Sequence, residues 1–212
     1  MICICVLTDM APALSLMLEK PEKDLLKRPP RKKNQHLVDW KLILQAYPYL
    51  GLFEGIASHF VFFLYLTWYG NFAIGDIFFA YDKWSDGYKN YTKTQLDDFV
   101  FTGQTITYVC LVVVQAFGNV FVTRTNYKSL FSRLPFLEKG RNLWIFSAQF
   151  ITVSLMILIV YLPFVNSIFN TRQIPPQFFF IPLGFAFLLI FLDELRKLFV
   201  RKNVLCFSKI SW

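Results

Sequence analysis

Long apolar stretches separated by short charged segments run through the whole chain. Residues 99–123, 142–171 and 173–192 contain no charged side chain, and residues 1–18 and 42–75 contain one acid each. A hydrocarbon core about 30 Å thick is crossed by roughly 20 helical residues, so each stretch is long enough to span a bilayer. The pattern predicts five membrane-spanning helices, at about 1–18, 47–69, 99–122, 143–165 and 177–195.

Basic residues are concentrated in alternate segments between these spans. Of the 22 Lys and Arg residues, eight lie in 19–45, five in 123–141 and five in 196–212, whereas 70–98 and 166–176 hold the other four. Because cytoplasmic segments carry the excess of Lys and Arg, the first three segments are predicted to be cytoplasmic. The C-terminus is then cytoplasmic, and the chain starts at the opposite face, within a helix that no basic flank precedes. This start favours a chain cut from a longer one over a secretory signal peptide.

The composition points to the same class of protein. Hydrophobic residues make up 55% of the chain and aromatic residues 19%, and the mean hydropathy is +0.43. The expected fold class is therefore an all-α membrane protein, a bundle of about five transmembrane helices. The sequence has no nucleotide-binding loop and no Ser/His/Asp set, so no catalytic or cofactor-binding residue is assigned. The basic run 27–33 is interpreted as a loop against anionic headgroups, and nucleic-acid binding is not expected.

Asp9 is the most informative acid because it lies within a predicted span. A carboxylate near the middle of a bilayer costs about 2.5–3.5 kcal/mol and by default marks an ion path or a proton relay. Pro12 follows closely, and a proline removes a backbone donor and leaves carbonyl oxygens free beside the carboxylate. With the Thr8 hydroxyl, these oxygens suit an alkali or alkaline-earth cation. The alternative is an interfacial Asp9 that is paired or reaches the membrane surface.

Three more polar residues lie within the predicted spans. Glu54 is either a second ligand or a protonated acid that hydrogen-bonds a neighbouring helix. Gln115 and Asn119 are four residues apart and share one helical face. This spacing suits cation coordination or hydrogen bonds between helices, and the residues by themselves favour the second.

Segments near both ends of the chain resemble one family of ion pumps. Thr8–Leu16 (TDMAPALSL) and Glu19–Arg31 (EKPEKDLLKRPPR) together resemble the sixth transmembrane helix and following cytoplasmic loop of type II P-type cation ATPases. Leu188–Leu198 (LLIFLDELRKL) resembles the last helix of the sodium/potassium and proton/potassium pump α subunits. The order of the spans and the charge sidedness run parallel between these ends. The resemblance thus covers essentially the whole chain and implies the last five of ten helices.

The resemblance implies a partial cation site. Asp9 falls on a cation-coordinating Asp of the family, and Thr8 keeps its companion hydroxyl. Asn119 falls on an acidic ligand of the sodium-specific site, and Gln115 lies within one residue of a family Gln. A second coordinating Asp of the family falls on Cys5, so one carboxylate of the family site is replaced.

Other family features are changed or have no counterpart. The paired Glu of the ninth helix falls on Ile151 and Thr152, and the outer-loop segment that contacts the β subunit falls on Asp86–Lys89 without being preserved. These differences bear on sodium selectivity and on β-subunit binding. The Asp-Lys-Thr-Gly phosphorylation motif and the nucleotide domain have no counterpart in this sequence. ATP and magnesium would therefore bind elsewhere, and we do not expect this chain alone to hydrolyse ATP.

The resemblance predicts the C-terminal membrane module of a sodium/potassium-type P-type ATPase α subunit. Such a module would contribute to the binding and transport of monovalent cations in the plasma membrane. Its expected partners are the lipid bilayer, the N-terminal part of the pump and a β subunit at the outer loop 70–98. The alternative is a free-standing, pump-derived membrane protein that acts as a regulator or partner without transport.

Overall fold

The structure, a computed structural model, describes residues 8–19, 38–78, 84, 87–88, 90–125, 129–130 and 142–202. The regular secondary structure of these residues is helical, apart from a single isolated β-bridge between Tyr88 and Tyr91. The helices are α1 (Met10–Met17), α2 (Trp40–Leu44), η3 (Gln45–Gly51), α3 (Leu52–Gly70), α4 (Ile74–Ile77), α5 (Lys93–Val114), η4 (Gln115–Asn119), α6 (Val120–Thr123), α7 (Trp144–Tyr161), α8 (Pro163–Phe169) and α9 (Gln177–Arg201). The symbol η marks π-helical segments.

Four continuous helices are long and apolar enough to cross a membrane. They are Trp40–Gly70, Lys93–Thr123, Trp144–Tyr161 and Gln177–Arg201. These four confirm the predicted spans at 47–69, 99–122, 143–165 and 177–195 as helices. The predicted span at 1–18 is described only from Thr8 onward, and its helical part is the 8-residue α1. Most of the predicted cytoplasmic linkers 19–45 and 123–141, and the tail after 202, lie outside the described residues.

The boundaries of the spans differ from those predicted for local reasons. The predicted span 143–165 ends at Tyr161 because Leu162 precedes Pro163 and takes an extended conformation, with φ −77° and ψ 117°. Pro163 then begins the separate helix α8. The second span begins at Trp40, and Pro48 lies within it because the chain takes up a π-helical turn there instead of ending the helix.

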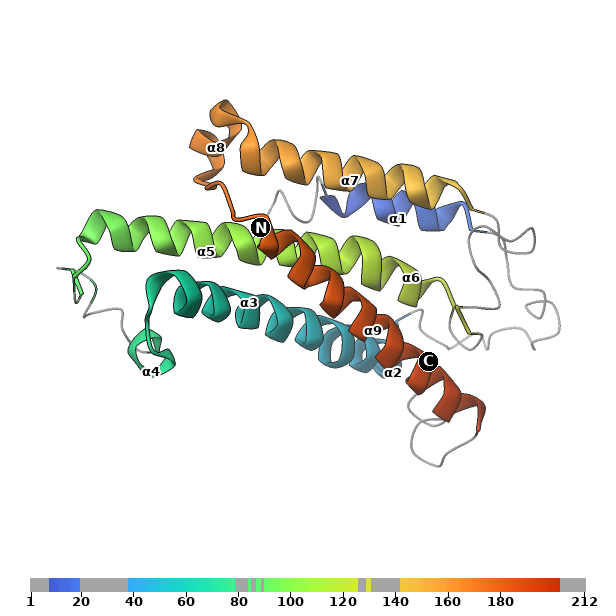
Figure 1. Cartoon of the computed structure of the whole chain (residues 1–212). Coiled ribbons are helices and arrows are strands. Elements are labelled where there is room, and N and C mark those ends of the chain that lie inside the picture. Colours follow the sequence, from blue (N-terminus) through green and yellow to red (C-terminus); the bar gives the residue numbers. More distant parts are fainter. Residues whose placement is uncertain are drawn as a thin grey trace.

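The long helices pack around one apolar core. In Figure 1, α3 and α5 run side by side, α9 crosses them, and α1 lies along α7. Each of these helices except α1 contributes fully buried side chains to the core, namely Val61, Ile106, Val109, Val160 and Phe178. The side chains turned outward are also large and apolar, as a bilayer requires, and include Phe60, Phe150, Phe180 and Phe187.

The helix α9 approaches η4 closely at one glycine. A Cβ atom on Gly118 would lie 3.3 Å from the Cα atom of Ala186 and 3.1 Å from Cδ2 of Leu189. Small residues at such a crossing let two membrane helices approach each other. The crossing therefore fixes α9 against the turn that carries two of the predicted site residues.

Candidate cation site

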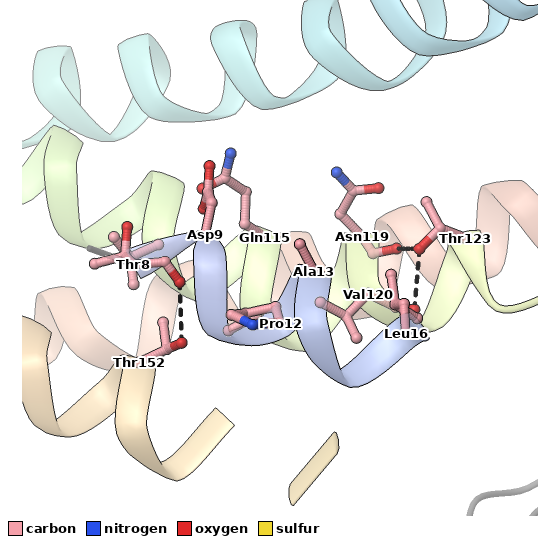
Figure 2. A pocket seen from close by; sticks show the side chains of 12 residues that line it. Thr8, Asp9, Pro12, Ala13, Leu16, Gln115, Asn119, Val120, Thr123 and Thr152 are labelled. Carbon is pink, nitrogen blue, oxygen red and sulfur yellow. Dashed lines mark hydrogen bonds between the residues drawn. The ribbon is translucent and has the colours of Figure 1, made fainter. Parts of the chain in front are cut away.

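Asp9 lies at the start of α1, where Pro12 interrupts the backbone hydrogen bonds. In an α-helix the carbonyl oxygen of Thr8 would accept from the N–H group of residue 12, which a proline does not have. The hydroxyl of Thr152 in α7 instead donates to this carbonyl oxygen at 3.1 Å (Figure 2). The expectation that Pro12 frees a carbonyl oxygen is thus corrected in one respect, because a neighbouring helix already engages the oxygen that it frees.

A cavity of about 220 Å³ lies between α1, the α5–η4–α6 helix and α7. Four of the predicted site residues line it, together with Thr152: Thr8, Asp9, Gln115 and Asn119. Thr8 is fully buried, whereas Asp9 is partly exposed. Figure 2 shows the side chains of Asp9, Gln115 and Asn119 projecting to the same side, toward the cyan ribbon of the helix that contains α3. The structure therefore brings together residues that lie more than a hundred positions apart in the sequence.

Gln115 and Asn119 are the first and last residues of the π-helical segment η4. A π turn is wider than an α turn, so it accommodates an extra residue in a helix that otherwise keeps its direction. The resemblance to the pump family places Gln115 within one residue of a family Gln, and the extra residue of the π-helical segment lies at this position. The side chain of Gln149 supports the wide turn by donating from Nε2 to the carbonyl oxygen of Ala116 at 2.9 Å. The two amide side chains thus remain on one face.

Glu54 approaches the same residues from α3, although it does not line the cavity itself. The residue is 8% exposed, the side chains of Asn119 and Gln115 form hydrogen bonds with its carboxyl group, and the charge of Asp9 acts on the same group. Within the described part of the chain, Oε1 of Glu54, Oε1 of Gln115 and Oδ1 of Asn119 are buried and have no hydrogen-bond partner. The structure therefore gathers buried oxygen acceptors from two helices beside the Asp9 carboxylate.

The predicted residues form one cluster, and two contributors to it were not predicted. Thr152 was noted only as the replacement of a family carboxylate, and Gln149 was not singled out. A polar residue in an otherwise apolar span was the available signal for both. Among the described residues, no three His, Cys, Asp or Glu side chains gather in a way that could hold a metal ion. The cluster therefore consists mainly of carboxylate, amide and hydroxyl oxygens, and Cys5 lies outside the described residues.

A buried ion pair joins the helix that carries Asp9 to the helix that carries Asn119. Arg124, just after α6, donates to Glu19, just after α1, with an N–O distance of 2.9 Å. Asn142 donates from Nδ2 to the same carboxylate at 3.0 Å and to the carbonyl oxygen of Ser15 at 2.9 Å. These contacts fix α1, α6 and the start of α7 relative to one another. The helices on both sides of the cavity are therefore held in fixed relative positions.

A second buried network holds the end of α9. Lys197 is fully buried, and its ammonium group lies 2.5 Å from a carboxylate oxygen of Asp193. It also donates to the hydroxyl of Thr125 at 3.0 Å and to the carbonyl oxygen of Val122 at 3.3 Å. A cation at the carbonyl end of a helix is favourable because it meets unpaired carbonyl groups and the negative end of the helix dipole. Lys197 thus fastens α9 to the end of α6.

Comparison with known proteins agrees with this arrangement. The pattern of the family described as "Cation transporting ATPase, C-terminus" matches residues 1–199. The sodium/potassium-transporting ATPase subunit alpha of Hydra vulgaris is 30% identical over 213 residues, which cover 95% of this chain and 20% of that protein. The alpha-3 subunit of Rattus norvegicus and the alpha-4 subunit of Homo sapiens are each 29% identical over 212 residues, with the same coverage.

The fold and the apolar helices define a multi-pass integral membrane protein. The chain belongs to the C-terminal family of the cation-transporting ATPases, and the sodium/potassium-transporting ATPase α subunits are similar to it. This confirms the resemblance inferred from the two end segments. The chain spans about a fifth of the length of these curated relatives.

Proposed function

We propose that this chain is the C-terminal membrane module of a sodium/potassium-type cation pump and supplies part of its intramembrane cation site. Asp9 would provide the charged ligand, Thr8 the neighbouring oxygen and Asn119 a neutral amide oxygen. The carboxylate attracts the cation, and the uncharged oxygens replace part of its hydration shell. The transported ligand is a monovalent cation, as in the pumps whose α subunits are similar to this chain.

The observation that carries this proposal is the common cavity of Thr8, Asp9, Gln115 and Asn119. These residues come from α1 and η4, and the oxygens of both amides are buried without a partner in the described part of the chain. Helix–helix hydrogen bonds were the alternative role for Gln115 and Asn119. Both amide side chains do form hydrogen bonds with the carboxyl group of Glu54 in α3, and their oxygens, which remain unpartnered, support coordination in addition to that role, because buried acceptors are ordinarily satisfied.

Energy for transport has to come from outside this chain. The proposed partner is therefore an N-terminal pump portion that carries the phosphorylation and nucleotide domains, assembled with this chain in the plasma membrane with the C-terminus in the cytoplasm. A β subunit at the outer loop 70–98 is a further proposed partner. Described residues at that end include an aromatic group, in which the ring of Phe72 lies tilted against those of Trp84 and Tyr91, at 5.1 and 5.4 Å between ring centroids.

The test is co-expression with a sodium/potassium pump α subunit truncated before its sixth transmembrane helix. Copurification of the two parts and ATP hydrolysis that depends on sodium and potassium are the expected results. Asp9→Asn should raise the half-saturating cation concentration about tenfold or more, because it removes the charge and keeps the shape. Asn119→Ala should have a smaller effect, since it removes one amide dipole.

The matched control is Asp97→Asn, which removes one negative charge from an exposed position in α5. It should leave the half-saturating concentrations unchanged. If Asp9→Asn behaves like Asp97→Asn, Asp9 is a structural acid. Copurification without any cation-dependent hydrolysis would favour the alternative of a regulator or partner that does not transport.

A further inference from the structure

We infer that Glu54 is a direct ligand of the cation, so that two carboxylates from α1 and α3 bind it together with the amide oxygens of η4. This inference deepens the proposed function and rests on the cation site described there. The ligand class is a hard cation that prefers oxygen ligands. Glu54 would then decide how strongly the site distinguishes cations by charge.

The first argument is the burial of Glu54. The residue is only 8% exposed, and Oε1 has no hydrogen-bond partner in the described part of the chain. Burying a carboxylate oxygen without a partner is costly, and the hydrogen bonds that Gln115 and Asn119 form with this carboxyl group leave Oε1 unsatisfied. The backbone carbonyl oxygen of Glu54 accepts from the hydroxyl of Ser58 at 2.7 Å, but Oε1 has no such contact.

The second argument is the character of the neighbouring groups. The carboxyl group of Glu54 lies close enough to another acid, Asp9, to feel its charge, and it forms hydrogen bonds with the side chains of two neutral amides, Gln115 and Asn119. No basic side chain among the described residues forms an ion pair with Glu54 or Asp9. Two carboxylates held near each other in a buried place repel unless a positive charge lies near both. A bound cation supplies that charge.

The third argument is the convergence of unpartnered oxygens. Oε1 of Glu54, Oε1 of Gln115 and Oδ1 of Asn119 come from two different helices, and each of these buried atoms lacks a hydrogen-bond partner in the described residues, although the amide groups of Gln115 and Asn119 hydrogen-bond the carboxyl group of Glu54. One such atom could be a local imperfection of packing, but three in one cluster share a single explanation. A hard cation binds carboxylate and amide oxygens, and it would satisfy all three.

The position of α3 suits this role. Glu54 lies in the first turn of α3, directly after the π-helical segment η3. Helix α3 packs against α5, and α5 continues directly into η4, so Glu54 and the two amides lie on neighbouring helices. A ligand on a rigid helix is held in place more accurately than one on a loop.

The experiment measures cation binding by the 212-residue chain itself, purified in detergent or in lipid nanodiscs. Radiolabelled sodium, rubidium and calcium are titrated separately against a choline background of constant ionic strength. Glu54→Gln keeps the shape of the side chain and one carbonyl oxygen but removes the charge. It should weaken binding about tenfold or more, because it removes one of two full charges next to the cation. The exposed variant Asp97→Asn should bind as the wild type does.

The charge of the bound cation distinguishes a direct ligand from a structural residue. A purely structural effect of Glu54→Gln would not depend on that charge. Coulomb attraction scales with the product of the charges, so Glu54→Gln should weaken calcium binding by a larger factor than sodium binding. Melting in choline alone shows whether the variant folds, and the neutral glutamine side chain should not lower the midpoint. If Glu54→Gln does not fold, Glu54→Asp takes its place, and its shorter, charged side chain should cause a smaller loss.

Three outcomes overturn parts of this scheme separately. If Asp9→Asn loses binding while Glu54→Gln binds within twofold of the wild type, the role of Glu54 is wrong and the Asp9 site stands. If the wild-type chain binds none of the three cations, the two-carboxylate site is wrong. If binding depends on Glu54 but co-expression with the pump portion yields no ATP hydrolysis, the proposed function is wrong and the cation site stands.

Discussion

The hydroxyl of Thr152 donates a hydrogen bond of 3.1 Å to the carbonyl oxygen of Thr8. This hydrogen bond replaces the one that a backbone N–H group at position 12 would donate, because Pro12 has no such group. It also orients Thr8 and Asp9 toward the cavity they share with Gln115 and Asn119. Thr152 therefore holds an interrupted helix in shape.

Replacing Thr152 should destabilise the protein even though the new side chain has nearly the same shape. Thr152→Val removes the hydroxyl and leaves the buried carbonyl oxygen of Thr8 unsatisfied, at a cost of about 1–3 kcal/mol. The apparent midpoint of thermal unfolding in detergent measures the loss. Thr123→Val is the control, since Thr123 is exposed and its hydroxyl bonds only carbonyl groups of its own helix. Equal midpoints for the two variants would contradict the role of Thr152.

Lys197 should be among the most sensitive positions in the described part of the chain. Lys197→Met removes one of the two basic partners of Asp193, whose carboxylate keeps its ion pair with Arg196 at 2.8 Å. It also removes the hydrogen bond to Thr125. The buried oxygen atoms left without a donor should cost about 1–3 kcal/mol. Thermal unfolding of the variant should therefore begin at a markedly lower temperature. The double variant Lys197→Met/Asp193→Asn should not recover the loss, because it leaves Arg196 without its carboxylate partner. Lys202→Met, at an exposed position, should change stability by less than about 0.5 kcal/mol.

Two glycine-to-alanine changes should have opposite signs. At Gly118 the new methyl group meets the backbone of Ala186 at 3.3 Å, and overpacking of this kind costs about 1–3 kcal/mol. At Gly184 in α9 nothing lies within 4 Å, so alanine should stabilise the helix by up to about 1 kcal/mol. The difference between the two unfolding midpoints is the measurement. A stabilising Gly118→Ala would mean that α9 and η4 are less tightly packed than described.

The predicted orientation can be tested by chemical labelling in intact cells. In a variant free of native cysteines, an impermeant thiol reagent should label Ser167→Cys from outside. It should reach Lys202→Cys only after the membrane is permeabilised. Both positions are exposed; Ser167 lies in α8 and Lys202 directly follows α9, and Figure 1 shows α8 and the C-terminal end of α9 far apart. The basis is the bias of 18 to 4 basic residues between the two sets of linkers. The reverse labelling pattern would refute the orientation.

The spans were predictable because membrane insertion depends on local properties. A charge-free stretch of sufficient length has to form a helix in hydrocarbon, whatever its neighbours are. The four described spans confirm this, and the differences are at their ends. Pro163 stops α7 early, but Pro48 lies inside a continuous helix, since a π-helical turn accommodates it. The effect of a proline therefore depended on its packing environment.

The candidate site was predictable only in part. Asp9 could be identified as unusual because a charge inside a span is costly wherever it lies. The role of Glu54 could not be inferred in the same way, because the two alternatives differ only in what its side chain meets. The same holds for Thr152, whose partner Thr8 is 144 positions away in the chain.

The sequence by itself determined the class of protein, the family, the predicted apolar spans and the identity of the two acids within them. Each of these follows from local composition or from a short motif. Only the tertiary structure decided which polar atoms meet and which remain without partners, including the π-helical register of Gln115 and Asn119 and the approach of Glu54 to Asp9. The physical reason is that a buried oxygen is satisfied or unsatisfied according to side chains on other helices. The positions of those helices depend on the packing of the whole bundle.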